Sequence, residues 1–273
     1  MIAVDIIAVS VRGDGLDGWP SAAPILAGAA PYVAAPARLP PPAILPPNER
    51  RRAGASVRLA LAVAQEAAEA SGLPPAALRS VFATGNGDGA TVHTILETLA
   101  GPDRQVSPTQ FHNSVHNAAA GYWSIGAGSM QPATCLGCHD GTAAAGLLAA
   151  ASEACAEQQP VLLCVYDLPL PEPLNTARPS AGIFGAGLVL APAGGTAAVA
   201  RLQIGWQETP APPDRVALFR EINGLAQSNP AGRLLRLLQA LAMRQPDRLA
   251  LPLLDGHLDV VVQPCSTAPP SKG

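Results

Sequence analysis

One short stretch of the chain, Cys135-Leu-Gly-Cys-His139, combines residue types that bind metals, hold haem or act as nucleophiles. Cys-x-x-Cys-His is the spacing of covalent c-type haem attachment, which makes haem or redox chemistry one interpretation. A zinc site would need two more close ligands, and cysteines 155, 164 and 265 form no second Cys-x-x-Cys. A reactive dithiol is expected at the start of a helix, but the helix expected here begins only after the pair. We therefore expect no metal and no cofactor, and we keep haem or redox chemistry as an alternative.

A second candidate is the glycine-rich stretch Gly85-Asn-Gly-Asp-Gly89, between an expected strand and an expected helix. The placement is similar to that of a phosphate-binding loop, but the third glycine is out of position and no Lys-Ser/Thr pair follows. A tight turn in which a glycine takes a positive φ is the simpler interpretation. The five histidines show no paired metal-binding spacing on a helix: His93, His112, His116, His139 and His257.

Composition limits the classes of protein to which the chain can belong. Its 273 residues are 48% hydrophobic, enough for a large buried core. Charged residues make up 14% and the net charge is −3, so neither nucleic acid nor an anionic membrane surface is an expected partner. The longest apolar runs, 143–151 and 184–192, are well short of the roughly 20 residues that cross a bilayer, so no transmembrane helix is expected.

The amino-terminal residues and the cysteines indicate the compartment. Residues 1–15 contain no basic segment, and Asp5 stands where a signal peptide would be apolar. Five cysteines, an odd number at irregular spacing, do not form a disulfide framework. We therefore expect a cytoplasmic protein.

Apolar periodicity and turn residues predict alternating strands and helices. A β-branched run at 2–11 indicates a buried strand, and the nine prolines of 20–47 indicate a surface excursion without helix or central strand. Residues 48–71 indicate one helix that ends at Gly72. Further strands are expected at 79–83, 132–138, 160–171, 180–193, 200–208 and 258–264, and further helices at 91–101, 119–129, 140–157 and 213–243. The strands at 180–193 and 200–208 could pair antiparallel.

This alternation of strand, turn and helix is typical of an α/β fold. The almost continuously apolar strand at 160–171 is expected inside a sheet that is covered on both faces. We expect one compact α/β domain over residues 1–262 and a flexible tail over 263–273.

The stretch VSPTQFHNSVHNAAAGYWSI, residues 106–125, resembles a segment of β-ketoacyl-acyl carrier protein synthases. The matching residues are Ser107-Pro108, Asn117 and Ala120-Gly121. In that family the segment leads through a loop and a strand to the nucleophilic cysteine at the start of a buried helix. Here the loop ends at Gln131-Pro132, and with no gap the place of the nucleophile falls on Asp140.

The resemblance implies that the usual catalytic set is absent. Cys138 comes two residues too early, which along a strand displaces a side chain by roughly 6.6 Å. Asp140 can accept the free N–H groups of a helix start and complement its dipole, but a carboxylate cannot form the thioester. The family's two histidines and lysine lie in its second half. This chain has no His-Gly-Thr motif and is expected to be too short for a complete second half. A free-standing condensing enzyme or acyltransferase that uses Cys138 is the alternative.

More closely, the chain resembles the short ketosynthase-like subunits of bacterial aryl polyene clusters, which are of the chain-length-factor type. The shared residues include Glu49-Arg-Arg-Arg52 before a Leu/Ala-rich helix and the aspartate in place of cysteine. The resemblance covers about 1–262 but is specific only over 107–150. It implies a thiolase-like fold and a heterodimer with an active ketosynthase, which receives acyl-phosphopantetheine on an acyl carrier protein. A homodimer in isolation is also consistent with it.

In such heterodimers, as the family implies, the inactive subunit lines the far end of the acyl tunnel. On that model the residues expected to face the partner or the growing chain are Phe111, His112, His116, Asn117, Tyr122, Trp123 and Met130. The alternative for each is ordinary core packing, and for His116 and Asn117 a buried polar pair. Arg50–Arg52 could form a solvated basic turn or meet an acidic partner.

Overall fold

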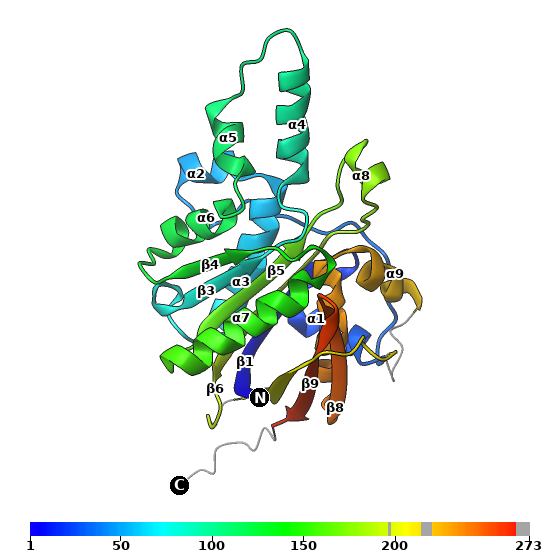
Figure 1. Ribbon diagram of the computed structural model, residues 1–273. Helices are drawn as coiled ribbons and strands as arrows, with labels where there is room; N and C mark the ends of the chain where they lie inside the picture. The colour runs from blue at the N-terminus through cyan, green and yellow to red at the C-terminus, as the bar shows by residue number, and fades with distance from the viewer. Residues whose placement is uncertain (196–197, 214–219, 266–273) are drawn as a thin grey trace.

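A mixed sheet of nine strands forms the centre of the computed structural model, which describes residues 1–195, 198–213 and 220–265 (Figure 1). The strands are β1 (Ile2–Gly13), β2 (Leu16–Asp17), β3 (Arg79–Ala83), β4 (Ala133–Leu136), β5 (Val161–Asp167), β6 (Phe184–Pro192), β7 (Ala200–Gln207), β8 (Asp247–Leu253) and β9 (Gly256–Pro264). Their order is β4-β3-β5-β6-β1-β7-β9-β8, with β2 paired to β1. Strand β3 is parallel to β4 and β5, and the other pairs are antiparallel.

Helices cover both faces of this sheet. They are α1 (Trp19–Leu26), α2 (Pro47–Arg52), α3 (Ala55–Ser71), α4 (Gly89–Ala100), α5 (Pro108–Ser114), α6 (Ala118–Ala127), α7 (Thr142–Glu157), α8 (Leu174–Ala177), α9 (Arg220–Ser228) and α10 (Leu235–Met243), with short 3₁₀ turns η1 (Pro75–Ala77), η2 (His139–Gly141) and η3 (Ala231–Leu234). Helices α3 and α6 pack on one face, and α7, η3 and α10 pack on the other.

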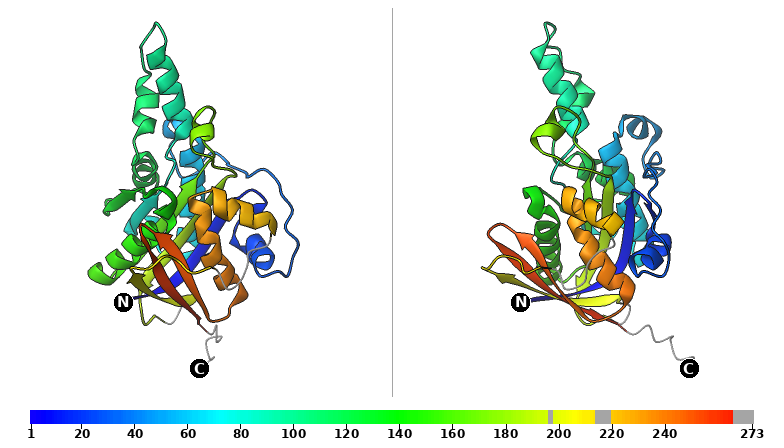
Figure 2. Two further views of the ribbon diagram at one scale, coloured as in Figure 1. Left: turned by 45° about the vertical axis from the view of Figure 1, so that its right-hand side comes forward. Right: turned by 90° about the vertical axis from the view of Figure 1, so that its right-hand side faces the viewer.

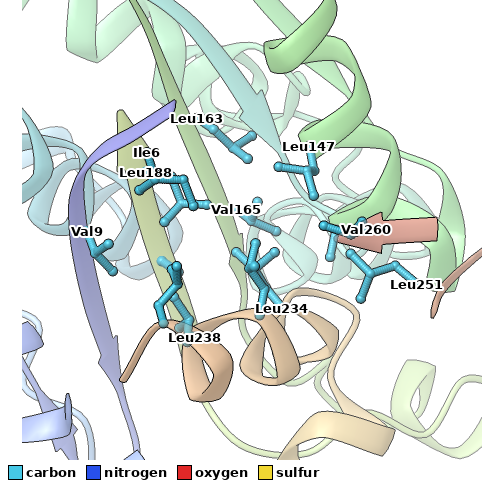
Figure 3. Packing of buried hydrophobic residues seen from close by; sticks show 14 of the residues in the cluster. Ile6, Val9, Leu147, Leu163, Val165, Leu188, Leu234, Leu238, Leu251 and Val260 are labelled. Carbon is cyan, nitrogen blue, oxygen red and sulfur yellow. The ribbon is translucent and has the colours of Figure 1, made fainter. Parts of the chain in front are cut away.

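The core is therefore divided by the sheet into two apolar layers. On the α7 side, Leu147 and Leu234 meet Leu163 and Val165 of β5 and Val260 of β9 (Figure 3). All seven residues of β5 are buried, as expected for a strand covered on both faces. This confirms the α/β fold predicted from the alternation of elements.

Helices α4 and α5 form an antiparallel pair that projects away from the sheet (Figures 1 and 2). Helix α4 begins with Asp88, whose carboxylate accepts a hydrogen bond from the Thr91 N–H at 3.0 Å, an N-cap. Although α4 has twelve residues, none of them is buried. A helix of that length in a globular protein ordinarily buries one face against the core. Helix α4 buries none, so it is more exposed than its length leads one to expect.

The expected helix at 48–71 is wrong, because the chain forms two helices that meet at Ala53 and Gly54. Ala53 is extended, with φ −65° and ψ 112°. Its carbonyl accepts a hydrogen bond from the Arg58 side chain, and the Arg52 carbonyl accepts one from Asn113. Side-chain donors thus replace the backbone donors that a continuous helix would supply.

The expectation of no helix in the proline-rich excursion is wrong for its first residues. Helix α1 begins at Trp19, with Pro20 in its first turn, where the missing N–H is not needed. Residues 27–46 then form neither helix nor strand.

Two expectations about the later strands are also corrected. Strands β6 and β7 do not pair with each other, because β1 lies between them and pairs antiparallel with both. Strand β8 was not expected, and it forms a hairpin with β9.

The expected helical stretch at 213–243 is interrupted. Helices α9 and α10 and the turn η3 occupy its described part, and residues 214–219 lie outside the described residues. Residues 266–273 of the expected tail also lie outside the described residues.

Candidate functional site

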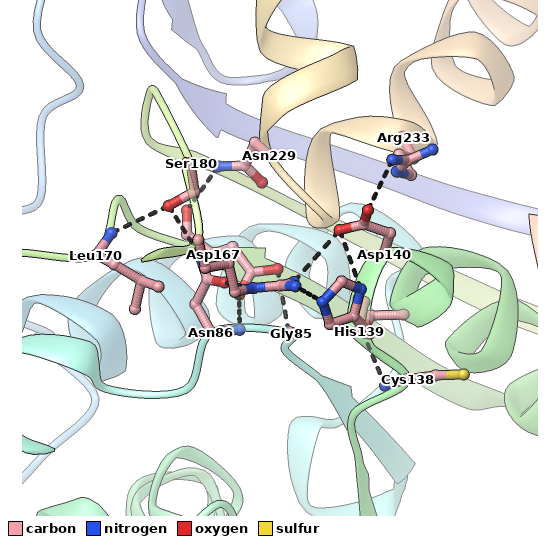
Figure 4. A network of polar contacts seen from close by, with 12 residues as sticks. Gly85, Asn86, Cys138, His139, Asp140, Asp167, Leu170, Ser180, Asn229 and Arg233 are labelled. Carbon is pink, nitrogen blue, oxygen red and sulfur yellow. Dashed lines mark hydrogen bonds and ion pairs between the residues drawn. The ribbon is translucent and has the colours of Figure 1, made fainter. Parts of the chain in front are cut away.

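The carboxyl ends of the parallel strands β3, β4 and β5 meet at one edge of the sheet, where α/β proteins commonly place their sites. Residues 84–88 follow β3, residues 137–141 follow β4, and residues 168–183 follow β5. The segment 229–233, which leads into η3, joins them. Figure 4 shows that side chains from all four segments form one polar network.

Asp167, the last residue of β5, holds the glycine-rich turn in place. Its buried carboxylate accepts hydrogen bonds from the Thr84 hydroxyl at 2.7 Å and the backbone N–H groups of Asn86 at 2.8 Å and Gly85 at 3.2 Å. Burial raises the pKa of Asp167, and these donors oppose that shift. The donors are neutral, so the carboxylate acts as the structural centre of the turn.

Two glycines of this turn are required, one for its backbone conformation and one for close packing, which supports the turn interpretation made from the sequence. Gly87 has φ 62°, a conformation that favours glycine. A Cβ atom on Gly85 would lie 2.8 Å from the His139 carbonyl oxygen and 2.9 Å from Pro230 Cβ. Glycine at position 85 therefore lets the turn after β3 contact both the segment after β4 and the segment before η3.

Asp140 lies in η2, directly before α7, and is held by two arginines. Its Oδ1 is 3.3 Å from Nη2 of Arg178, and its Oδ2 is 3.2 Å from Nη2 of Arg233. Nε of Arg178 donates to Asn86 Oδ1 at 3.2 Å, and Arg178 also contacts the His139 ring. The backbone reaches this position through His139 with φ 48°, a conformation that non-glycine residues seldom adopt.

The expected role of Asp140 as a cap of α7 is not what the geometry shows. The carboxylate makes ion pairs instead of accepting N–H groups at the helix start. No described side chain caps α7, and the Thr142 hydroxyl bonds to the residues before the helix: it accepts the Cys138 N–H at 2.9 Å and donates to the His139 carbonyl at 2.6 Å. Both carboxylate oxygens of Asp140 are taken up by arginines from outside the helix.

A cavity of about 470 Å³ lies beside Asp140 and is lined by Cys138, Arg233 and the β8–β9 turn at Pro252–Leu254. Cys138 is half-buried and follows β4 without belonging to it. Cys135, in β4, packs against the α3 layer, whereas Cys138 packs against the α7 layer. Residues three apart near a strand face opposite ways, so the two thiols do not converge on one haem or metal. Burial raises the pKa of Cys135.

Within 1–195, 198–213 and 220–265, no group of three or more His, Cys, Asp or Glu side chains is arranged to hold a metal ion. None of the helices in those ranges has the length and apolar character needed to cross a bilayer.

The residues expected to face a partner or an acyl chain separate into two groups. Tyr122 and Trp123 are buried in the α3 layer, and the Tyr122 hydroxyl lies 3.0 Å from Asn113 Oδ1. The exposed residues of the set are Phe111, His112, His116, Asn117 and Met130. The buried polar pair considered for His116 and Asn117 is therefore wrong, and core packing describes only the two aromatic residues of α6.

Phe111 and Met130 belong to a larger set of exposed apolar side chains. Eleven large apolar side chains are exposed among the described residues, and seven of them are Val92, Leu96, Leu99, Phe111, Val115, Ile125 and Met130. The next element along the chain is β4, which pairs only with β3 in the described sheet and so has an open edge. We call these seven side chains and the β4 edge the 92–136 surface. Exposed large apolar side chains and an open strand edge are both features of association sites.

The basic residues of α2 are partly structural. Arg50 donates to the carbonyls of Ala43 at 3.0 Å and Leu45 at 2.8 Å, and so fixes the end of the proline-rich segment. Arg51 and Arg52 are exposed and contact Asn48 and Glu49 of the same helix. This arrangement matches the solvated basic turn for two of the three arginines.

The residues of the network that were not identified from the sequence include Asp167, Arg178 and Arg233. For Asp167 a signal was present, because a carboxylate that directly ends an apolar strand needs buried donors. For Arg178 and Arg233 no local signal exists, since each lies in a loop or turn and reaches Asp140 from 38 and 93 residues away.

Comparison with known proteins agrees with this architecture. The model for the N-terminal domain of β-ketoacyl synthases matches residues 27–220, more than half of the chain, and the chain belongs to this family. No curated protein matches the chain.

Solved structures share the fold at low sequence identity. A chain of the ketosynthase ApeO in complex with its chain length factor ApeC, from Xenorhabdus doucetiae, has a TM-score of 0.72 and 17% identity over 96% of this chain and 100% of that one. The ishigamide ketosynthase/chain length factor has a TM-score of 0.65 and 14% identity over 96% of this chain and 99% of that one. AntDE:AntF, a type II acyl-carrier protein in complex with its ketosynthase, has a TM-score of 0.68 and 11% identity over 97% of this chain and 99% of that one. The thiolase-like fold expected from the resemblance is confirmed.

Proposed function

We propose that the chain is a catalytically incomplete ketosynthase-like subunit of the chain-length-factor type, which pairs with an active β-ketoacyl-acyl carrier protein synthase. The observation that carries this proposal is Asp140 at the start of α7, where the family resemblance places the nucleophile. A carboxylate paired with Arg178 and Arg233 cannot form the thioester through which condensation proceeds. The partner would then supply the cysteine and histidines.

The 92–136 surface supports the pairing. Its open β4 edge offers unpaired N–H and C=O groups to another chain, and its apolar side chains gain by leaving water. On this proposal Phe111, His112, His116, Asn117 and Met130 face the partner or the growing chain, while Tyr122 and Trp123 support them from the core. Two of the solved structures that share the fold are of a ketosynthase with its chain length factor, which adds support.

The substrate in this proposal follows from the sequence resemblance, and the location follows from the amino-terminal residues and the cysteines. The complex would elongate aryl polyene, polyketide or fatty acyl chains held as acyl-phosphopantetheine on an acyl carrier protein, in the cytoplasm. In the absence of its partner the chain could use the same surface to form a homodimer.

Co-expression with a full-length ketosynthase encoded beside the gene for this chain tests the proposal. The ketosynthase alone is expected to be insoluble or inactive, and co-expression with this chain should restore condensation of acyl- and malonyl-acyl carrier protein. Asp140→Ala, where it is folded at the assay temperature, should restore condensation as well as wild type does. Failure of every such ketosynthase to bind, or a strict need for the Asp140 carboxylate in turnover, would contradict the proposal.

A pair of variants tests the location of the contact. Phe111 and Val33 are exposed to similar extents, 66% and 69%, but only Phe111 lies in the 92–136 surface. Phe111→Asp should reduce co-purification with the ketosynthase, because a charge in an apolar contact must lose its hydration. Val33→Asp should leave it unchanged. Equal loss with both variants would place the contact elsewhere.

The position of Cys138 favours a second candidate function, a free-standing acyltransferase or condensing enzyme. Cys138 shares the 470 Å³ cavity with Asp140, so a thiol and a polar group adjoin the same space. This alternative predicts that an acyl thioester or a cerulenin-type electrophile labels the isolated chain at Cys138 and not at Cys135. Intact-mass and peptide mass spectrometry of wild type and Cys138→Ser would decide, and an unlabelled wild-type chain would exclude it.

A further inference from the structure

We propose that Arg178 and Arg233 form a carboxylate-binding site at the start of α7, and that Asp140 is its built-in ligand. This site is separate from the 92–136 surface, and it does not depend on the proposed pairing with a ketosynthase. The chemical class that it binds is a small carboxylate anion, which the chain supplies from its own side chain.

The geometry of the three side chains carries this inference. Each oxygen of the Asp140 carboxylate meets a different guanidinium, at 3.3 Å for Arg178 and 3.2 Å for Arg233 (Figure 4). The arginine side chains are 24% and 29% exposed, so both have lost most of their contact with water. Two guanidiniums that share one carboxylate leave an excess positive charge at the site, which favours an anion between them.

The Arg178 side is held in place independently of Asp140. Its Nε donates to Asn86 Oδ1, and the Asn86 amide in turn donates to the Leu168 carbonyl at 2.9 Å and the Ser180 hydroxyl at 3.2 Å. These contacts remain if the Asp140 carboxylate is removed. A guanidinium that is already positioned loses less side-chain entropy when it binds an anion.

The place of the Asp140 carboxylate can also be reached from solvent. The Asp140 side chain is 52% exposed, and the cavity of about 470 Å³ is lined by both Asp140 and Arg233. A molecule the size of formate or acetate can therefore reach the place of the carboxylate once the side chain is shortened. In the intact chain Asp140 occupies that place and connects the loop after β5, the start of α7 and η3.

Chemical rescue of Asp140→Ala tests the proposal. The variant should unfold at a temperature about 2–4 °C below wild type, a shift of the size expected for one lost ion-pair cluster in a chain of this length. Sodium formate or acetate should raise that temperature back toward the wild-type value, and the gain should increase with concentration as for any ligand of the folded state. Sodium chloride at the same ionic strength should not. The measurement needs only the purified full chain, alone or with its co-purified partner.

Matched variants separate site binding from general salt effects. Asp103→Ala removes another exposed aspartate, far from the site in the connection between α4 and α5, and should show no difference between formate and chloride. Asp140→Glu keeps a carboxylate and should need no rescue. Adding Arg178→Gln or Arg233→Gln to Asp140→Ala should abolish the formate-specific gain.

The proposal is overturned if Asp140→Ala responds to formate no more than Asp103→Ala does, or if the response persists without the arginines. Should Asp140→Ala be insoluble, refolding in formate and in chloride provides the same test. A higher soluble yield in formate supports the site, and equal yields contradict it. Because none of these measurements uses a ketosynthase, failure here is distinguishable from failure of the pairing.

Discussion

The centre of the sheet and its β4 end differ in how completely the chain covers them. Strands β5, β6 and β1 are buried between α3 and the α7 layer, and Asp5 and Asp167 on these strands have all the partners that buried carboxylates need. At the β4 end, α4 buries none of its residues, and the described sheet stops at an open edge. The first region is complete within the chain, whereas the 92–136 surface is of the kind that a second chain completes.

The largest expected effect tests whether the centre of the sheet is complete within the chain. Leu163 of β5 is fully buried, and Leu163→Ala should lower the free energy of unfolding by about 2–5 kcal/mol, because it removes buried methyl groups and leaves a cavity. Ile125→Ala, at a residue that is 53% exposed on α6, should change it by about 0.5 kcal/mol or less. Urea denaturation measures both, and similar losses would show that the 92–136 surface is part of the self-contained core.

The next effect concerns association. Leu96→Asp on α4 should weaken binding to the ketosynthase by roughly tenfold or more, since a charge would be buried against an apolar contact, while the free energy of unfolding changes by about 0.5 kcal/mol or less. Leu254→Asp, on the β8–β9 turn, is the matched control and should bind normally. Titration calorimetry of the two variants separates the outcomes, and unchanged affinity for Leu96→Asp would remove α4 from the interface.

A smaller effect is expected at Asp167. Asp167→Asn should lower the free energy of unfolding by about 1–3 kcal/mol, because an amide offers one acceptor oxygen where the carboxylate satisfies three donors, and its NH₂ would face backbone N–H groups. Binding to a ketosynthase should not change in the folded variant. Thermal unfolding checks this, and a variant as stable as wild type would show that the burial penalty on the charge outweighs its hydrogen bonds.

The smallest effect is a pH dependence that belongs to the buried region. Burial by itself would raise the pKa of Asp5, but the Arg201 side chain and the Gly194 and Gly195 N–H groups outweigh burial and lower it. Below about pH 4, the ordinary value for an unfolded aspartate, the folded chain therefore binds fewer protons than the unfolded chain. Stability from this group should be complete above that pH and should be lost as the pH falls through the folded pKa.

Asp5→Asn measures this contribution. The variant should be less stable than wild type at pH 7, and the difference should shrink during acid titration followed by circular dichroism. A difference that stays constant from pH 7 to the acid transition would mean that the Asp5 charge does not contribute.

Local sequence signals predicted the elements that their own residues determine. The apolar run of β5 and the small residues of α6 and α7 placed these elements close to their observed bounds. The break between α2 and α3 could not be predicted in the same way, because the donors that permit it come from Arg58 and from the distant Asn113. Likewise, β1 separates β6 from β7 by pairings that span most of the chain.

The candidate site was predictable only in part for the same physical reason. The resemblance identified Asp140 and the exposed residues Phe111 and Met130, but helix capping was the expected role of Asp140, since only neighbouring backbone groups are visible in a sequence. The ion pairs with Arg178 and Arg233 depend on segments that are distant from Asp140 in the sequence. A coincidence of spacing also misleads: Cys135 and Cys138 suit haem attachment in sequence, yet they pack on opposite faces of the sheet.

Hydrogen exchange of the chain with and without its ketosynthase tests the central claim most directly. The account predicts that binding slows exchange of backbone amides in 92–136, with the β4 amides at the open edge strongly protected, and leaves the β8–β9 hairpin unchanged. Peptides from β5 should be slow in both states, because β5 is already buried. A stable complex in which protection falls on β8 and β9 while 92–136 exchanges freely would contradict the account.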